Sequence, residues 1–242
     1  PKKISEFREK PRDPEPVPGD DTQALVSMGN YIFNAQALID AIERDALDET
    51  STHDMGGDII PYFVEQGTAG AYDFTFNKIP GATERDRSYW RDVGTIDSYY
   101  DAHMDLISTM PIFNLYNDEW PVFNQQINMA PAKFIHDSEG NQGRTNDSIV
   151  SLGVVVSGSV IERSVLSPNV RVFSRSLVTD SVILDNVEIG RDCTIRKAIL
   201  DKDVAVADGA SIGVNRERDI ERGFTVTDSG ITVVTKGLLV KP

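Results

Sequence analysis

Residues 89–95, with the sequence Tyr-Trp-Arg-Asp-Val-Gly-Thr, carry a carboxylate in a setting that suits metal binding. Asp92 stands between the aromatic Trp90 and a Gly-Thr pair of the kind that begins a helix. We expect it at the C-terminal end of a strand, which is the edge of an open α/β sheet where ligands bind. Mg²⁺ takes one or two carboxylates together with phosphate oxygens, so Asp92 is a candidate metal ligand. An Asp92 that caps the helix beginning at Thr95, or that pairs with Arg91, fits the sequence equally well.

A lysine near the N-terminus offers a positive charge to an anionic ligand. Lys10 follows Glu9 at the end of an expected strand over residues 4–9, and a proline comes next and restricts the backbone. A lysine ammonium is a compact point charge that suits phosphate. Ser27 and Gly29 are small enough to admit a ligand close to the backbone. Each of these patterns alone also fits ordinary surface or turn residues.

Alternating strand and helix patterns are expected to position these side chains. A buried strand is predicted over residues 25–33, and Asn34 after it can cap a helix. A second helix, with Ile59, Ile60, Phe63 and Val64 buried, is expected to end at Gly67, and a strand follows over residues 71–79. Strands that alternate with helices are typical of an α/β domain, here residues 1–110. The side chains that the first helix is expected to bury are Leu38, Ile39, Ile42 and Ala46.

A repeat marks the C-terminal part of the chain. Val170, Val187 and Val204 are 17 residues apart, and a shorter spacing of six recurs within each unit. A six-residue repeat is typical of a parallel β-helix, in which roughly three hexads form one coil. We therefore predict a left-handed parallel β-helix over residues 148–242, preceded by a linker over residues 111–147. Asn, Asp and Gly, including Gly190, Gly209 and Gly213, are expected at its corners.

Composition disfavours several classes of partner. The net charge is −14, which disfavours nucleic acid and anionic membranes as partners because both would be repelled. Cys193 is the only cysteine, so no intrachain disulfide can form, and its place in the repeat indicates an inward-facing residue. The three histidines share no ligand spacing. No apolar run approaches about 18 residues, and we expect a cytoplasmic protein.

Four segments occur together in one order: residues 9–11 (Glu-Lys-Pro), 27–33 (Ser-Met-Gly-Asn-Tyr-Ile-Phe), 53–61 (His-Asp-Met-Gly-Gly-Asp-Ile-Ile-Pro) and 89–95. With the repeat behind them, the chain resembles the C-terminal half to two-thirds of bacterial glucose-1-phosphate adenylyltransferases over essentially all of its residues. The resemblance implies an α/β fold, namely a partial nucleotidyltransferase Rossmann-like sheet with flanking helices, followed by the β-helix.

The resemblance also implies the chemistry. Glucose 1-phosphate would attack the α-phosphorus of ATP, releasing pyrophosphate and ADP-glucose, as the first committed step of bacterial glycogen synthesis. Lys10 matches the lysine that holds the phosphate of glucose 1-phosphate, and Glu9 beside it matches a residue that touches the sugar. Asp92 matches the second acidic residue of the Mg²⁺ site.

Other matched positions lie on the sugar side of the implied site. Ser27 and Gly29 match a segment that lines the glucose pocket, and Trp90 matches a residue that shapes the metal site. His53, Asp54 and Asp58 match a motif near the sugar. The family's Gly-rich nucleotide loop and its first metal-binding Asp are not among these residues, and we expect both upstream of residue 1.

Regulation is implied in the same way. The family forms homotetramers that are controlled by anionic metabolites bound between the catalytic domain and the β-helix. Lys202 matches a basic position of that effector site, and Arg216, Arg218 and Lys236 are further cationic candidates. A solvated coil face is the alternative interpretation of these four residues.

Other functions remain to be weighed against this one. A hexapeptide acyltransferase is disfavoured because that chemistry needs a histidine base on a coil, and residues 149–213 contain none. A non-catalytic regulatory subunit would have no need of Lys10, Ser27 and Asp92. A relative that uses UTP or GTP stays open, because these residues do not read the base.

Overall fold

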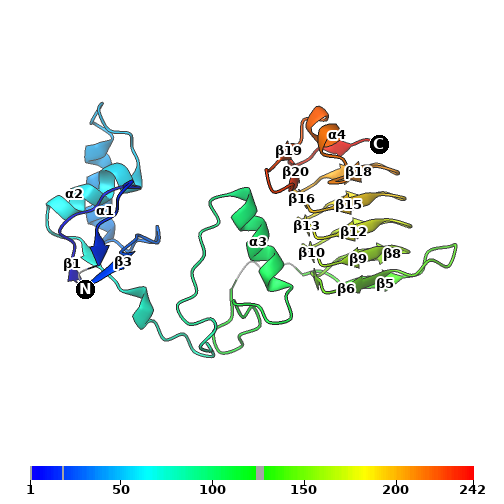
Figure 1. Ribbon diagram of the computed structural model, residues 1–242, viewed down its shortest axis with the longest axis horizontal. Coiled ribbons are helices and arrows are strands. Elements are labelled where there is room, and N and C mark those ends of the chain that lie inside the picture. The colour runs from blue at the N-terminus through cyan, green and yellow to red at the C-terminus, as the bar shows by residue number, and fades with distance from the viewer. Residues whose placement is uncertain (1, 18, 124–127) are drawn as a thin grey trace. The chain divides into compact units, whose positions relative to one another are not determined.

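The computed structural model describes residues 2–17, 19–123 and 128–242. The chain divides into two compact units, Pro1–Asn77 and Lys78–Pro242 (Figure 1). Within the part of the chain that is described, no helix combines the length and the apolar character needed to cross a membrane.

The first unit is built from short elements. In chain order these are β1 (Lys2–Lys3), β2 (Pro16–Val17), β3 (Asp20–Ala24), α1 (Ala35–Asp45), the π-helix η1 (Met55–Ile59), α2 (Ile60–Glu65), β4 (Gly70–Ala71) and the 3-10 helix η2 (Phe74–Phe76). Strand β1 pairs with β4, and β2 pairs with β3, both antiparallel. Each sheet described in this unit therefore has only two strands.

Helix α1 begins where the sequence predicts. The side chain of Asn34 caps it by accepting a hydrogen bond of 3.2 Å from the amide of Ala37. Its predicted buried face is wrong in part, because Ile39 and Ile42 are about half exposed (48% and 47%) and Ala41 is the buried residue. Asp45, one turn after Ala41, is hydrogen bonded to the loop that follows the helix, and this turns the Ala41 side inward.

The second predicted helix is confirmed, with an irregular start. Ile59 and Ile60 are buried, as expected, and Gly67 follows α2 with a φ of +67°. A left-handed conformation of this kind is cheap only for glycine and ends the helix. The first turns form the π-helix η1, which begins at Met55, four residues before the first residue expected to be buried.

Three predicted strands of this unit are wrong. Residues 4–9 and 25–33 are not in strands, and the stretch 71–79 contains only the end of β4 and the 3-10 helix η2. Leu25 is 84% exposed, although the apolar run around it predicted burial. A strand is stable only with hydrogen-bonded neighbours, and an apolar run does not say whether a neighbour is present.

The second unit is a parallel β-helix with three faces (Figure 1). One face orders β19 (Thr225–Val226), β20 (Thr232–Val234), β16 (Ala198–Leu200), β13 (Val182–Ile183), β10 (Val165–Leu166) and β7 (Ile149–Val150). The next orders β21 (Leu239–Val240), β17 (Ala205–Val206), β14 (Glu188–Ile189), β11 (Arg171–Val172), β8 (Val155–Ser157) and β5 (Lys133–Ile135). The third orders β18 (Ser211–Ile212), β15 (Thr194–Arg196), β12 (Leu177–Thr179), β9 (Val160–Glu162) and β6 (Arg144–Asn146). All neighbours pair in parallel except β19 with β20.

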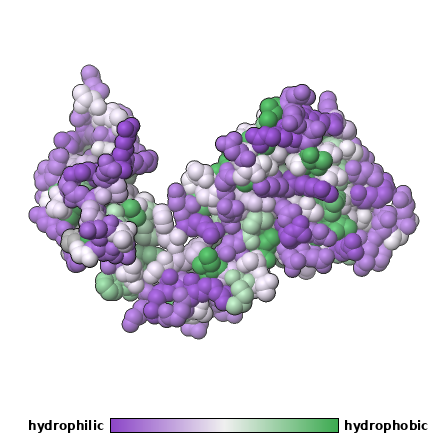
Figure 2. Space-filling view, viewed as in Figure 1, coloured by the Kyte–Doolittle hydropathy of each residue, from purple (hydrophilic) through white to green (hydrophobic). Residues whose placement is uncertain are grey.

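The repeat of 17 residues is one coil, as predicted. Leu177 pairs with Thr194 and Val182 with Ile199, each 17 residues further on. The three valines of the repeat are fully buried, and hydrophilic side chains cover most of the coil surface in the view of Figure 2. The coil interior therefore holds one continuous apolar core.

Polar ladders join the coils at their corners. Asn169, Asn186 and Asp203 all have a φ near +60° (63°, 61° and 62°). The Asn169 amide donates to Asn186, and the Asn186 amide donates to Asp203, each at 2.9 Å. Gly209 also adopts a positive φ of +80°, whereas Gly190 lacks one and instead makes room for Asp208 and the backbone of the next coil.

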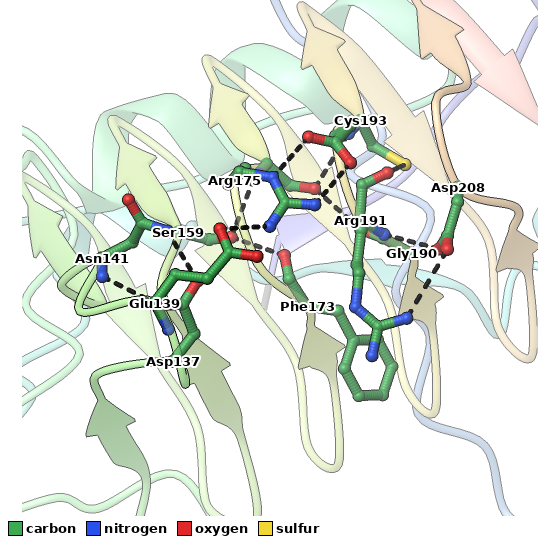
Figure 3. Close-up of polar contacts among 12 residues, drawn as sticks. Asp137, Glu139, Asn141, Ser159, Phe173, Arg175, Gly190, Arg191, Cys193 and Asp208 are labelled. Atoms are coloured by element: carbon green, nitrogen blue, oxygen red, sulfur yellow. Dashed lines mark hydrogen bonds and ion pairs between the residues drawn. The ribbon is translucent and has the colours of Figure 1, made fainter.

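A second ladder runs inside the coils (Figure 3). The amide of Ser176 donates to the hydroxyl of Ser159, and the amide of Cys193 donates to the hydroxyl of Ser176, both at 2.9 Å. Cys193 is 1% exposed and thus takes the place that serine holds one and two coils earlier. The prediction that this cysteine faces inward is confirmed.

Helix α3 (Ile96–Leu106) packs on the face that contains β13 and β16. Tyr100 contacts Val182, Ile199 and Ile231 there, and its hydroxyl donates to the carbonyl oxygen of Asp180 at 2.7 Å. The division between the two compact units therefore lies before α3.

Both ends of the β-helix differ in detail from the prediction. It begins at β5 and β6, within the segment 111–147 that the sequence assigned to a linker, of which residues 124–127 lie outside the described part. At the other end, β19 and β20 form an antiparallel pair. Helix α4 (Arg216–Glu221) precedes them, capped by Asn215.

Candidate functional site

Lys10 presents its ammonium to solvent beside a carboxylate. Its Nζ lies 3.2 Å from Oε1 of Glu9, and its side chain is 91% exposed against 39% for Glu9. The backbone of Lys10 has a φ of +43°, a conformation that side chains other than glycine rarely adopt. The lysine therefore sits at a tight bend, paired with Glu9 among the residues that the structure describes, and its exposed ammonium is open to an anion.

The other oxygen of the Glu9 carboxylate lies against the turn that begins η1. A methyl group built on Gly56 would overlap Oε2 of Glu9 and come within 3.0 Å of its Cδ. The same methyl would lie 3.4 Å from Oδ1 of Asp54. The structure thus brings together two segments that the sequence singled out separately, residues 9–10 and residues 53–58.

Hydrogen bonds hold the turn at residues 53–58 in shape. Asp54 caps η1 by accepting from the amide of Gly57 at 2.6 Å. Asp58 accepts from the amide of Asp54 at 2.9 Å and from the hydroxyl of Thr52 at 2.7 Å. These hydrogen bonds lower the pKa of Asp58 below its usual value, and the bond from the Asp54 amide has the larger effect.

The same turn is also tied to the end of α1. Nδ1 of His53 lies 2.8 Å from one carboxylate oxygen of Asp45, and the hydroxyl of Ser51 donates to the other at 2.6 Å. Asp45 keeps only 15% of its side chain exposed. Asp45 was not singled out in the sequence, where it is one acidic residue among many on a helix.

Ser27 and Gly29 form a turn of their own. The amide of Gly29 donates to the hydroxyl of Ser27 at 3.2 Å, and that hydroxyl lies 2.9 Å from the hydroxyl of Tyr31. Gly29 has a φ of +71°, which explains why a glycine stands there. Both residues are exposed, and their role in lining a sugar pocket stays a prediction.

Asp92 lies in the second unit, in an irregular segment before α3. It is not at the end of a strand, so that part of the prediction is wrong. Its Oδ1 accepts from the amide of Gly94 at 3.1 Å, and the carboxylate is exposed. The helix cap is Thr95, which exchanges hydrogen bonds with Ser98, so Asp92 is not occupied in capping.

The described residues offer one protein ligand for a metal at this position. Among them, no group of three or more His, Cys, Asp or Glu side chains is placed to hold an ion. A single exposed carboxylate fits Mg²⁺ only where phosphate oxygens and water supply the remaining ligands. Trp90, two residues before Asp92, is 44% exposed. Asp92 can thus complete a metal site but does not form one alone.

The four basic candidates for an effector lie in two groups at the α4 end of the β-helix. Lys202 and Lys236 belong to neighbouring turns, because the amide following Lys236 donates to the carbonyl oxygen of Lys202 at 2.9 Å. Arg216 donates to the carbonyl oxygen of Thr227 at 2.7 Å, and Arg218 stands on the same helix. Lys236 also faces Asp203 at 3.8 Å.

Comparison with known families matches both parts of the chain. Residues 1–109 match the nucleotidyl transferase family, and residues 130–234 match the family described as GlmU-like, C-terminal hexapeptide. Together with the coil register, these matches confirm the predicted fold class: a nucleotidyltransferase part followed by a parallel β-helix.

The chain is similar along its length to curated proteins named glucose-1-phosphate adenylyltransferase. It is 58% identical over 242 residues to the protein of Leifsonia xyli subsp. xyli, covering 100% of this chain and 58% of that one. It is 58% identical to the protein of an Arthrobacter species over 240 residues, covering 99% of this chain and 52% of the relative. The Parafrankia protein is 55% identical over 238 residues, 98% of this chain and 58% of the relative. The predicted resemblance is thus confirmed, for a chain that spans little more than half the length of these relatives.

Proposed function

We propose that this chain is the sugar-phosphate-binding and β-helix portion of a glucose-1-phosphate adenylyltransferase. The observation that carries the proposal is the open ammonium of Lys10, held by Glu9 in a chain with 58% identity along its full length to proteins of that name. The reaction would join glucose 1-phosphate to ATP and yield ADP-glucose and pyrophosphate.

Lys10 and Glu9 would act on the sugar phosphate. The ammonium would pair with the phosphate and orient one of its oxygens toward the α-phosphorus of ATP. A bond forms between that oxygen and the α-phosphorus, and the bond from the α-phosphorus to the departing pyrophosphate breaks. Glu9, which touches Lys10 at 3.2 Å, would hold the ammonium in place and accept from sugar hydroxyls. Ser27, Gly29 and Trp90 would complete the sugar and metal sides.

Asp92 would hold a divalent ion, for which we propose Mg²⁺. When bound, the ion supplies positive charge that stabilises the phosphates as charge shifts between them. The support from the structure is chemical: Asp92 is an exposed carboxylate that is free of the helix cap at Thr95, and Mg²⁺ is usually held by one or two carboxylates together with phosphate oxygens.

Assembly, control and location form the rest of the proposal. We place the enzyme in the cytoplasm as a homotetramer, with anionic metabolites as effectors. The support for an effector is the pair Lys202 and Lys236 on adjoining turns, with Arg216 and Arg218 on α4 of the same unit. Several lysine and arginine side chains in one unit are suited to bind the phosphate groups of a metabolite.

The first test is the complete protein assayed for ADP-glucose from ATP and glucose 1-phosphate, with UTP and GTP in parallel. Lys10→Ala should raise KM for glucose 1-phosphate about 10- to 100-fold, as expected for loss of one charge-assisted hydrogen bond, and leave KM for ATP nearly unchanged. Lys78→Ala, another exposed lysine, serves as the matched control. Equal effects on both substrates would contradict the role given to Lys10. A higher kcat/KM with UTP or GTP would favour the related enzymes, and no turnover with any of them a non-catalytic subunit.

Asp92→Asn tests the metal role. We expect kcat to fall by about 100-fold or more, because the ion's charge stabilises the transition state by several kcal/mol. The apparent affinity for Mg²⁺, measured by titrating the ion in the assay, should fall with it. Asp101→Asn on α3 is the control for removing one exposed carboxylate. Normal turnover with an unchanged Mg²⁺ dependence would rule out Asp92 as a ligand.

A further inference from the structure

Gly56 is in close contact with the Glu9 carboxylate, 47 positions earlier in the chain. The space that a side chain at residue 56 would fill is taken by Oε2 of Glu9. The other oxygen, Oε1, faces the Lys10 ammonium at 3.2 Å. The glutamate therefore bridges the turn at residues 53–58 and the lysine that offers charge to a phosphate.

We propose that Gly56 is a positioning residue for the sugar phosphate: its lack of a side chain lets Glu9 lie against the turn and so fixes the Lys10 ammonium. The inference rests on the function proposed above and adds a residue that acts through Glu9 without touching the ligand. The backbone of Gly56 does not explain the glycine, since it is not among the described residues with positive φ.

A methyl group at residue 56 should displace the Glu9 side chain and leave the turn at residues 53–58 in place. The turn is fixed by Asp54, which caps η1 through Gly57, and by the contact of His53 with Asp45. The segment at residues 4–15 has no helix or strand, and the Glu9 atoms in contact are the end of a flexible side chain. The displacement should therefore disturb Glu9 and Lys10 while the unit stays folded.

The neighbouring glycine offers a matched control. Gly57 lies in the same π-helix η1 and also lacks a positive φ, so alanine fits its backbone as well as it fits that of Gly56. A methyl group on Gly57 would meet Oδ1 of Asp54 at 3.3 Å and does not reach Glu9 among its nearest atoms. Both methyl groups would lie near Oδ1 of Asp54, and only the one on Gly56 has Glu9 among its nearest atoms.

The experiment is steady-state kinetics of the complete protein carrying each substitution. Gly56→Ala should raise KM for glucose 1-phosphate about 5- to 30-fold, the size expected for one displaced charge-assisted contact. KM for ATP, kcat and the melting temperature should change little, and Gly57→Ala should stay within about twofold throughout.

A double-mutant cycle separates positioning from a general loss of structure. In a Glu9→Ala background, Gly56→Ala should have no further effect, because the side chain through which it acts is gone. Effects that multiply in the double variant, or a Gly57→Ala enzyme as impaired as Gly56→Ala, would overturn the inference. If the unmodified protein makes no ADP-glucose, the proposed function fails. If it does and Gly56→Ala binds glucose 1-phosphate normally, only this inference fails.

Discussion

In the β-helix each coil repeats the hydrogen bonds and buried positions of the coil before it, whereas the unit Pro1–Asn77 is held by short contacts that occur once. Val170, Val187 and Val204 are fully buried at the same place in successive coils. In the first unit Leu25 and Ile32 stand 84% and 103% exposed. The candidate side chains for the sugar phosphate and the metal lie on turns of the first unit and on the segment before α3, outside the repeat.

The difference indicates that the β-helix provides most of the stable core, whereas turns outside the repeat carry the side chains that would recognise the sugar phosphate. In a stack of similar coils, each interface between neighbouring coils adds to the free energy of unfolding. Substitution of a side chain inside the coils is therefore expected to be destabilising. A turn such as residues 53–58 depends on a few hydrogen bonds, and a single methyl group can redirect a side chain that rests on it. Functional residues commonly lie on such turns because a rigid scaffold elsewhere carries the fold.

The largest effect that tests this comparison concerns Cys193. Burial both shields its thiol and raises its pKa, which lowers the fraction of reactive thiolate. In the native chain, Ellman's reagent should react about a thousandfold or more slowly than in denaturant, because reaction requires the coil to open. The rate is measured by absorbance. Cys193→Ser, which places serine in the ladder of Ser159 and Ser176, should fold normally and give no signal. Rapid reaction in the native state would show that the coil interior is open.

Next in size is a pair of isoleucine truncations, one in each unit. Ile195→Ala should reduce the free energy of unfolding by about 2–5 kcal/mol, since its side chain is fully buried between coils. Ile39→Ala on α1, where the side chain is 48% exposed, should cost less than about 1 kcal/mol. Denaturant titrations, followed by Cys193 reactivity for the β-helix and by hydrogen exchange for α1, measure the two. Equal losses would remove the distinction between the units.

The smallest effect concerns the contact of α3 with the coils. Tyr100→Phe removes a hydroxyl that donates to the Asp180 carbonyl at 2.7 Å and should cost about 0.5–1.5 kcal/mol. Burial, with a smaller effect from Asp180, raises the pKa of Tyr100 from 10.0 to about 12. A raised pKa in the folded state means that this stabilisation is complete below pH 10 and is lost as the pH rises toward 12.

Hydrogen exchange of α3 between pH 9 and 12 measures that loss. In the Tyr100→Phe variant, protection of α3 against hydrogen exchange should be lower at pH 9 than in the unmodified chain. It should then fall less between pH 9 and 12, because the variant has no hydroxyl to titrate. A variant with the same alkaline profile as the unmodified chain would show that Tyr100 does not titrate in the contact.

The sequence predicted the repeating unit well because its evidence is repeated. The 17-residue register and the inward position of Cys193 both follow from one pattern that is seen several times. The helix caps at Asn34 and Thr95 were predictable for another reason, since capping is chemistry between residues three apart.

The first unit was less predictable because its structure depends on partners that the local pattern does not name. The apolar run at residues 25–33 indicated a buried strand, yet burial and strand pairing both require a neighbour. The contact of Glu9 with Gly56 joins residues 47 positions apart without any periodicity. The Gly-Gly pair at residues 56–57 was the only visible sign, and a glycine pair alone does not say which atoms need the space.

Helix α3 acts as a mechanical link between the coils and the segment before it. Its first turn starts three residues after Asp92, at the cap residue Thr95, and its middle is docked on the β-helix by Tyr100. Because α3 is one continuous helix of 11 residues, docking its middle on the coils also fixes the direction of its N-terminal end. Asp92, three residues before the cap Thr95, therefore stands close to a helix end that the coil surface holds.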